Sequence, residues 1–524
     1  MTTDEPARQP APHGVRIDPS ALRRIFSFPV FLAAVLAAGA MAVTVWEKAP
    51  IPGGKLFVEG DTWWHLTVGE LILATHTWPT HDIYSLTAYG VPWIAYEWLG
   101  EVVMALAHRL AGLRGLAGLL VLLAILYALL VYFYAWLVSR HHLASACAAG
   151  LLLPVGAASF TLRPQVIGYI FFLITLICLE RYRQGKRRAL WVLPGLFLIW
   201  ANIHGSFPLG FFVLGLYWLS GLVSFRSGAL VAERLDTDRR RQVLWITLLC
   251  LVATMITPYG TRLAAYPLEY MSAQPVNLGL TIEWLPLDFV QPYAQMFLLI
   301  LLIALAAQVA APVTYRLDTL ALVLLMIGES CRHARFLIVF AAVIAPVLAT
   351  LFARWLPPYQ PEKDHPVLNA VLIAGMVGGM VALFPSQSKL ERTLAEIFPV
   401  RAVEYLRQHP LADQRMFNDG LWGGYLIWAT GPQRRVFIDG RFDIYEYRGV
   451  LIDYYNVITL HDNPEVIFTK YNVDSALVPR GPAIEVYMAS SPHWKHVYKD
   501  DVSVIFERNK DAAITLAAET PRQR

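Results

Sequence analysis

The chain has 524 residues, of which 56% are hydrophobic and only 16% are charged, and its formal net charge is +4. Soluble domains carry about a quarter of charged residues, so this composition indicates an integral membrane protein. The net charge is small and the arginines lie in short clusters between apolar runs, which excludes a nucleic-acid-binding surface. The four cysteines lie in or beside apolar runs and show neither metal-ligand spacing nor a disulfide framework.

A Pro-, Ala- and Arg-rich leader, residues 1–24, is predicted to be disordered and cytoplasmic. The first apolar run has the flanks of a signal peptide, but its length and its extended polar leader favour a retained helix. Runs long enough to cross a membrane predict about eleven spanning helices. They lie at 25–46, 115–139, 143–160, 166–180, 189–203, 208–225, 243–256, 293–311, 317–328, 336–355 and 368–384.

Basic clusters give the predicted orientation of these helices. The clusters at 23–24, 181–188 and 239–241 fall on one side of the helix count, and cytoplasmic loops are the ones enriched in Lys and Arg. The N-terminus is therefore expected inside and the C-terminal domain outside. We expect an integral protein of a bacterial inner membrane with a periplasmic C-terminal domain.

The C-terminal part of the chain has a different pattern of shorter elements. A transmembrane domain, 25–385, with a large first outer loop at 47–114, is followed by a predicted α/β domain at 386–524. The elements expected in it are helices at 400–409 and 464–471 and strands at 435–438, 474–478 and 502–506. The predicted fold class is a polytopic α-helical membrane protein with a C-terminal extracytoplasmic α/β domain.

Unusual polar segments interrupt the apolar pattern, and the topology places all of them on the outer face. They are 60–65, 162–165, 202–206, 281–284 and 332–335. Their convergence predicts one site there.

The segment Asp61-Thr-Trp-Trp-His65 opens a helical pattern that places His65 one turn beyond Asp61 on the same face. In one interpretation Asp61 is a helix N-cap and the tryptophans are interfacial anchors. In the other, the Asp61 carboxylate deprotonates an acceptor or holds a divalent cation, Mg²⁺ or Mn²⁺, while the lipid part of a substrate lies against the helices. No other cofactor is indicated.

This segment, followed by Asp82 and then Gly90, resembles the first outer loop of the oligosaccharyltransferase catalytic subunit, whose motif is Asp-x-aromatic-aromatic-His. That subunit belongs to the GT-C class, multi-spanning enzymes that take sugars from polyprenyl-phosphate donors on the extracytoplasmic side. The resemblance implies a GT-C-like fold, a polyprenyl-phosphate lipid as partner and a glycosyltransferase activity in the cell envelope.

The chain also departs from the family. The related enzymes carry an acidic pair in the second outer loop, whereas the segment 159–165 has no carboxylate, which argues against a metal site. Thr281-Ile-Glu283 matches the family's Thr-Ile-x-Glu motif with the acid one position early. The segment 418–425 is similar to the Trp-Trp-Asp-Tyr-Gly acceptor motif only in outline, so asparagine-linked transfer is not supported.

The candidate catalytic residues are Asp61, His65, Asp82 and Glu283. The candidate donor-binding residues are Trp63, Trp64, Arg163, His204, Arg332, His333 and Arg335. The arginines suit a phosphate because a guanidinium can make two parallel hydrogen bonds to it. In the alternative interpretation, arginines at the ends of membrane spans reach lipid headgroups.

Further charged residues have two interpretations each. Glu97 and Glu101 are one turn apart, and a solvated face of an interfacial helix is favoured over catalysis. Asp439, Arg441 and Asp443 follow an apolar run, where they either contact a ligand or pair with one another to fix a turn.

The sequence thus predicts a GT-C-like glycosyltransferase that moves a sugar from a polyprenyl-phosphate carrier to an acceptor on the outer face. The main rival is a non-catalytic protein of similar fold that binds a lipid-linked glycan or stabilises a complex. A transporter is disfavoured because the charges lie at the span ends and not near the membrane midplane. The sugar, the acceptor and any protein partner do not follow from the sequence.

Overall fold

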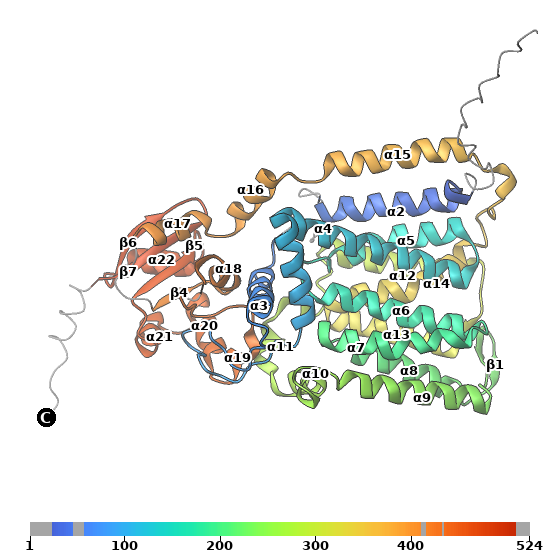
Figure 1. The fold of residues 1–524 in the computed structure, drawn as a ribbon, viewed down its shortest axis with the longest axis horizontal. Helices are drawn as coiled ribbons and strands as arrows, with labels where there is room; N and C mark the ends of the chain where they lie inside the picture. Colours follow the sequence, from blue (N-terminus) through green and yellow to red (C-terminus); the bar gives the residue numbers. More distant parts are fainter. Residues whose placement is uncertain (1–23, 46–56, 410–414, 432–433, 510–524) are drawn as a thin grey trace, which may run out of the picture.

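A computed structural model describes residues 24–45, 57–409, 415–431 and 434–509. Long helices lie side by side in a bundle at one end of the molecule, and a smaller domain with a sheet lies at the other (Figure 1). Helix α3, Asp61–Thr75, lies between the two. The predicted leader up to residue 23 and the start of the first outer loop, 47–56, are outside the described residues.

The bundle is built from apolar helices. They are α2 (Phe28–Val45), α4 (Trp98–Ser139), α5 (His142–Ala157), α6 (Gln165–Arg183), α7 (Leu193–Ile203), α8 (Pro208–Ser220), α9 (Thr237–Thr254), α12 (Pro292–Ala310), α13 (Leu317–Arg332), α14 (Leu337–Phe352) and α15 (Pro366–Leu383). Six of them are long and apolar enough to cross a membrane: α2, α4, α6, α12, α14 with its preceding turn, and α15. The membrane class is confirmed, and the count of eleven spans stays a prediction.

Helix α4 is bent where it enters the bundle. Ala111 and Gly112 leave helical geometry, and Gly112 has φ +58°, a conformation that glycine adopts at little cost. The segment before the bend packs against α3, and the segment after it coincides with the predicted span at 115–139. The bend therefore lets one helix belong to both the outer loop and the bundle.

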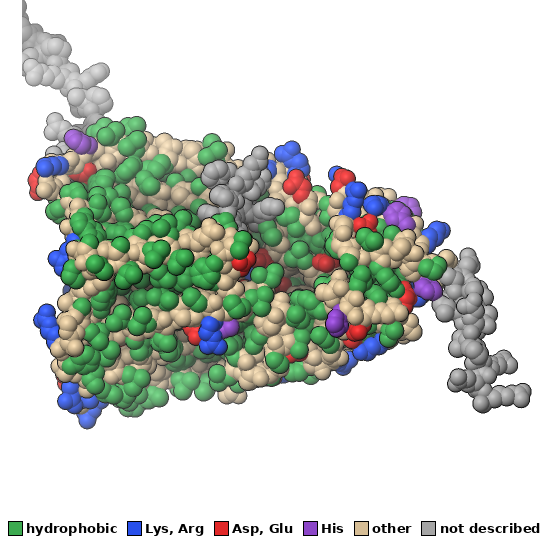
Figure 2. Space-filling view, turned by 180° about the vertical axis from the view of Figure 1, so that it is seen from behind, with side chains coloured by type: hydrophobic (Ala, Val, Ile, Leu, Met, Phe, Trp, Pro, Cys, Tyr) green, Lys and Arg blue, Asp and Glu red, His purple; other side chains and the backbone are tan. Residues whose placement is uncertain are grey.

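The charged and apolar side chains are unevenly distributed over the surface of the bundle, and the predicted orientation stays a prediction. Figure 2 shows basic side chains at the end of the bundle remote from the C-terminal domain, and a broad, mostly hydrophobic flank between the two ends. A flank of this kind suits lipid, and basic residues gather on the cytoplasmic side of membrane proteins.

We predict that cysteines at Lys186 and Ser490 label differently. Both side chains are exposed, Lys186 after α6 and Ser490 at the end of helix α22, Ala483–Ser490. In a background without the native cysteines, a membrane-impermeant maleimide added to intact cells should label Ser490→Cys and spare Lys186→Cys. Labelling of both after permeabilisation is the control, and the reverse pattern in intact cells would invert the orientation.

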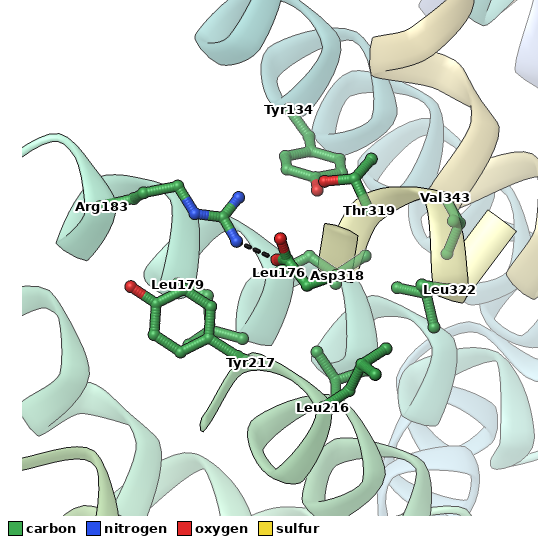
Figure 3. A pocket seen from close by; sticks show the side chains of 11 residues that line it. Tyr134, Leu176, Leu179, Arg183, Leu216, Tyr217, Asp318, Thr319, Leu322 and Val343 are labelled. Atoms are coloured by element: carbon green, nitrogen blue, oxygen red, sulfur yellow. Dashed lines mark hydrogen bonds and ion pairs between the residues drawn. The ribbon is translucent and has the colours of Figure 1, made fainter. Parts of the chain in front are cut away.

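An ion-pair network lies at the end of the bundle remote from the C-terminal domain (Figure 1). Arg183 at the end of α6 pairs with Asp318 at the start of α13 and with Glu180 (3.0 Å), and it lies over the ring of Tyr217 (Figure 3). The cavity beside this network measures about 30 Å³, roughly the volume of one water molecule. The network therefore ties α6 to α13 and leaves no room for a substrate.

The C-terminal domain contains a four-stranded sheet in the order β4-β5-β7-β6. Its strands are β4 (Met416–Asn418), β5 (Ser475–Pro479), β6 (Trp494–Lys499) and β7 (Ser503–Arg508), and β4 pairs parallel to β5 while the other pairs are antiparallel. Its helices are α16 (Gln387–Ile397), α17 (Val400–Gln408), α18 (Gly420–Thr430), α19 (Phe442–Glu446), α20 (Val450–Thr459), α21 (Pro464–Lys470) and α22. The helices predicted at 400–409 and 464–471 and the strands predicted at 474–478 and 502–506 are confirmed.

The segment 435–438, predicted to be a strand, is not part of this sheet. Its backbone pairs instead with the first outer loop, because Val436 N–H donates to Tyr84 O and Leu86 N–H donates to Val436 O. The extended, apolar character of the segment was correctly predicted. Its hydrogen-bonding partner belongs to another part of the chain, so the segment joins the loop to the domain.

Glycines allow α18 to pack closely on the start of α3. A Cβ on Gly424 would lie 2.2 Å from Gly60 O, and a Cβ on Gly60 would lie 2.1 Å from Leu421 O. Carbon and oxygen do not approach so closely, so both positions need glycine. This contact places the segment that follows β4 directly beside Asp61.

Candidate functional site

Two adjoining cavities lie where the bundle meets the C-terminal domain. The larger, of about 700 Å³, is lined by α3, by the outer loops and by the C-terminal domain. The smaller, of about 390 Å³, is lined largely by α8, by helix α10 (Thr261–Ala273) and by the start of α14. The wall residues common to both are Tyr96, Arg163, Tyr169, Tyr270, Glu283 and Arg335. Polar groups therefore gather where the cavities meet, and apolar side chains line the smaller one.

The Asp61 carboxylate faces the larger cavity and does not cap α3. Gly60 is the N-cap, and no side-chain hydrogen bond caps the helix. Trp64 Nε1 donates to Asp61 Oδ1 (3.1 Å), and Arg163 Nη2 lies 3.2 Å from Asp61 Oδ2. Burial raises the pKa of Asp61 above its ordinary value, although the Arg163 guanidinium opposes the shift. Directed contacts thus hold the Asp61 carboxylate in place. Its raised pKa makes it more basic than an ordinary aspartate, which suits a group that accepts a proton.

Gly440 fixes the other side of this carboxylate. A Cβ at Gly440 would lie 1.7 Å from Asp61 Oδ1, so no larger residue fits while the carboxylate stays in place. The C-terminal domain therefore completes the Asp61 site. Sequence reasoning missed Gly440, since nothing in the local pattern marks which glycine lies against another segment.

Arg163 and Arg335 converge on Glu283 at the shared wall of the cavities. Arg163 Nη1 lies 3.7 Å and Arg335 Nη1 lies 3.4 Å from Glu283 Oε1. The Arg335 guanidinium also lies 4.2 Å from the ring centroid of Trp284, which fixes its orientation. Burial tends to raise the pKa of Glu283, but Arg335 and Arg163 outweigh it and hold the pKa below the ordinary value.

A buried chain of ionisable groups lies behind this wall. His65 Nε2 is 3.3 Å from Glu97 Oε2, His65 Nδ1 is 3.1 Å from Glu101 Oε1, and His204 Nε2 is 3.2 Å from Glu97 Oε1. Glu97 and Glu101 are 3% and 0% exposed, so the interpretation as a solvated helix face is wrong. The ring of His65 and the rest of α3 cover the two glutamates. The only sequence signal for this burial is their one-turn spacing, which places both side chains on the same face of a helix.

The remaining predicted residues lie away from the cavities. Trp63 is fully buried against Phe398, Tyr425 and Trp428, where it joins α3 to the C-terminal domain. The Arg332 side chain is 74% exposed and lies 3.9 Å from Glu329. His333 Nδ1 lies 2.6 Å from Trp284 O and supports the segment that carries Glu283.

Asp82 also lies outside the cavities. It is fully buried, where Arg441 Nη1 lies 2.8 Å from Asp82 Oδ1 and the Tyr84 and Ser85 N–H groups donate to its carboxylate. Arg441 also makes two contacts to Asp439, from Nε at 2.8 Å and from Nη2 at 2.6 Å. The pairing interpretation of Asp439 and Arg441 therefore matches the geometry, and it includes Asp82.

The C-terminal domain contributes acidic side chains to the larger cavity, of which the sequence indicated only Asp443, as one of two interpretations. Asp419, the N-cap of α18, and Asp443 line the larger cavity together with Glu59. Burial raises the pKa of Glu59 to about 7 and that of Asp443 to about 6. Tyr266 donates to Asp443 Oδ2 at 2.8 Å. These carboxyl groups thus line the same cavity as Arg163 and Arg335.

The groups around Asp61 do not fit a divalent cation. Its two oxygens contact Trp64 Nε1 and Arg163, and a guanidinium excludes a metal ion from the position that it fills. Among the described residues no group of three or more His, Cys, Asp or Glu side chains is arranged to hold a metal. Arg163 supplies the positive charge beside the carboxylate.

Comparison with solved structures defines the fold. The archaeal oligosaccharyltransferase AglB from Archaeoglobus fulgidus, in complex with an inhibitory peptide and a dolichol-phosphate, aligns with a TM-score of 0.52 and 12% identity over 86% of this chain and 69% of that chain. The same organism's oligosaccharyltransferase tethered to an acceptor peptide aligns with a TM-score of 0.53 and 12% identity over 93% of this chain and 75% of that chain. ArnT from Cupriavidus metallidurans in the apo state aligns with a TM-score of 0.52 and 12% identity over 91% of this chain and 97% of that chain.

These neighbours are GT-C glycosyltransferases, and the chain has the GT-C fold. No protein-family model and no curated protein matches the sequence. Identity of this order establishes the fold alone, so activity has to be argued from the site.

Proposed function

We propose that the chain is a glycosyltransferase that transfers a sugar from a polyprenyl-phosphate-linked donor to an acceptor on the extracytoplasmic face of the membrane. The observation that carries the proposal is the juxtaposition of Asp61 with Arg163 and Arg335 where the two cavities meet. The complex of the similarly folded AglB with a dolichol-phosphate is consistent with a lipid of this class.

The two cavities divide the substrates by chemistry. The polyprenyl chain would lie in the smaller cavity, where Leu209, Phe212, Met271 and Phe336 offer apolar contacts. The donor phosphate would lie between Arg163 and Arg335 and displace Glu283, a carboxylate that forms ion pairs with both guanidinium groups. The acceptor would occupy the larger cavity beside Asp61.

In this arrangement the acceptor oxygen or nitrogen attacks the anomeric carbon of the donor sugar. The bond from that carbon to the phosphate oxygen breaks, and its electron pair stays on the phosphate. The acceptor O–H or N–H proton moves to Asp61, which acts as general base. Arg163 and Arg335 stabilise the charge that develops on the leaving phosphate.

Replacing Arg335 with Gln should weaken binding of a polyprenyl monophosphate, because a buried charged hydrogen bond is lost. Such bonds contribute about 1.5–3 kcal/mol, so the dissociation constant should rise roughly tenfold to a hundredfold. Binding to the purified protein in lipid nanodiscs can be measured by native mass spectrometry or microscale thermophoresis.

Arg332→Gln is the matched control, since Arg332 is three positions away and its side chain is 74% exposed. It should leave the affinity within about twofold, the range of a surface substitution. Equal weakening in both variants would indicate a headgroup effect, and unchanged binding in a folded Arg335→Gln variant would remove Arg335 from the phosphate site.

A further inference from the structure

Glu283 occupies the position that the proposed function gives to the donor phosphate. Its Oε1 atom lies 3.7 Å from Arg163 Nη1 and 3.4 Å from Arg335 Nη1. A carboxylate and a phosphodiester each carry one negative charge and offer oxygen atoms to a guanidinium group. The anion site between the two arginines is therefore filled by one of the protein's own side chains.

Arg163 and Arg335 each have a second support besides Glu283. Arg163 Nη2 lies 3.2 Å from Asp61 Oδ2, whereas its Nη1 atom faces Glu283. An anion that replaces Glu283 at Nη1 therefore leaves the contact with Asp61 unchanged. The Arg335 guanidinium lies 4.2 Å from the ring centroid of Trp284, which holds it by a cation–π contact. Both arginines thus keep their positions when the Glu283 carboxylate moves away.

The backbone that carries Glu283 is tied down, whereas its side chain has open space on both sides. The Trp284 N–H donates to Thr281 O at 2.9 Å, and His333 Nδ1 lies 2.6 Å from Trp284 O. Glu283 lines both the cavity of about 700 Å³ and the cavity of about 390 Å³, and its side chain is 26% exposed. Rotation about its side-chain bonds is therefore enough to move the carboxylate off the arginines and back.

Other carboxyl groups oppose a Glu283 carboxylate that has left the arginines. Glu59 and Asp61 line the larger cavity together with Glu283. Burial, and with it the negative charge of Glu283, raises the pKa of both Glu59 and Asp61, because the carboxylates repel one another. The same repulsion acts on Glu283, so its return to Arg163 and Arg335 is favoured.

We propose that Glu283 is an internal competitor of the donor phosphate, which pairs with both arginines between turnovers and returns to them to expel the product, and this inference rests on the function proposed above. The donor phosphodiester replaces Glu283 one charge for one. When the bond between the sugar and the phosphate oxygen breaks, the phosphate gains a negative charge and binds the arginines more strongly. The returning carboxylate competes for the same guanidinium groups and lets the polyprenyl phosphate leave.

Glu283 forms and breaks no covalent bond in this scheme. It sets the affinity for the phosphate and the rate of product release, so it acts through Arg163 and Arg335 and is not a catalytic residue. Sequence analysis placed Glu283 among the catalytic candidates, because a motif match gives no information about which side chains a carboxylate pairs with.

The test is the affinity of the full-length protein in nanodiscs for a polyprenyl monophosphate, compared between the wild type and Glu283→Gln. A competitor that fills a site in about nine molecules of ten weakens binding about tenfold. Glu283→Gln should therefore bind this lipid about tenfold more tightly and release it more slowly in a chase with unlabelled lipid. A polyprenol of the same length has no phosphate, so its affinity should be equal in the two proteins.

Two further variants separate competition from a general effect of charge. Glu269→Gln removes the same charge from the exposed side of α10, where the carboxylate accepts a hydrogen bond from Tyr447 at 3.1 Å. It should leave the affinity within about twofold, as expected for a surface substitution. Glu283→Asp keeps the charge but is one methylene shorter, so it should compete less well and give an affinity between those of the wild type and Glu283→Gln.

Unchanged or weaker binding of the monophosphate by Glu283→Gln would overturn the competitor role, and the weaker binding expected of Arg335→Gln would still support the phosphate site. Equal tightening in Glu269→Gln would also overturn the competitor role. Absence of monophosphate binding by the wild type and by both Glu283 variants would overturn the proposed function as well. If Glu283→Gln fails to fold, Glu283→Asp decides, because tighter binding supports competition and unchanged binding contradicts it.

Discussion

Replacing Asp61 with Asn should lower the rate of sugar transfer at least about a hundredfold, the smallest share that a general base usually contributes. Asparagine has the same shape as aspartate, fits against Gly440 and can still accept the hydrogen bond from Trp64 Nε1. It cannot take a proton from the acceptor. Folding and polyprenyl-phosphate binding should therefore persist while transfer is lost.

Transfer by the wild type should rise with pH as Asp61 loses its proton, and the midpoint should lie above the ordinary range for aspartate because burial raises its pKa. The Asn variant should lack this limb of the profile. Asp288→Asn, an exposed position in the outer loop before α12, is the control and should retain full activity.

The transfer rates of the wild type and of Asp61→Asn distinguish the proposed enzyme from a non-catalytic protein of the same fold. A large loss in Asp61→Asn, with lipid binding intact, supports a base at this position. Near-normal transfer by the variant would require another base, and Glu283 is the remaining carboxylate that lines both cavities. Binding of a lipid-linked sugar without transfer by the wild type, across a panel of acceptors, would favour the rival.

The local features of this protein could be predicted because they depend on neighbouring residues. The membrane class follows from long apolar runs, and the start of α3 follows from the pattern after Asp61. The resemblance of Asp61-Thr-Trp-Trp-His65 to a known outer loop directed attention to Asp61, whose carboxylate lines the larger cavity. Arg163 and Arg335 were predicted from the topology, which places several loops on one face, and Glu283 also from the near match of Thr281-Ile-Glu283 to a family motif.

Residues whose environment depends on distant segments could not be assigned in this way. Glu97 and Glu101 are polar and lie beside Trp93 and Trp98, which fits a solvated interfacial helix. Only the packing of α3 over them makes them buried. Arg332 and Arg335 are close in sequence, but α13 ends at Arg332 and the following turn directs the two side chains differently. The segment 435–438 likewise lies outside the sheet, because its backbone pairs with the distant first outer loop at Tyr84 and Leu86.

Replacing Arg441 with Gln should destabilise the protein by about 3–5 kcal/mol, the usual cost of removing one partner from a buried ion pair. Arg441 is 3% exposed and joins Asp82 of the first outer loop to Asp439 of the C-terminal domain. The variant would leave two buried carboxylates without their counter-charge. Thermal unfolding of the purified protein in detergent should show a clearly lower Tm.

Arg480→Gln is the matched control in the same domain. Its side chain is 49% exposed and lies 3.9 Å from Asp501, so its loss should change the stability by no more than about 1 kcal/mol. Asp82→Asn should cost less than Arg441→Gln, because Arg441 keeps both contacts to Asp439.

Arg441 also lines the larger cavity, so its effect on transfer has to be separated from its effect on the fold. If the ion pair is structural, any activity that remains in Arg441→Gln should have the normal Michaelis constant at temperatures below unfolding, because the folded fraction keeps its site. A variant with normal Tm and lost transfer would instead make Arg441 part of the acceptor site. In that case Asp82, its partner, would regain the functional role that the sequence suggested for it.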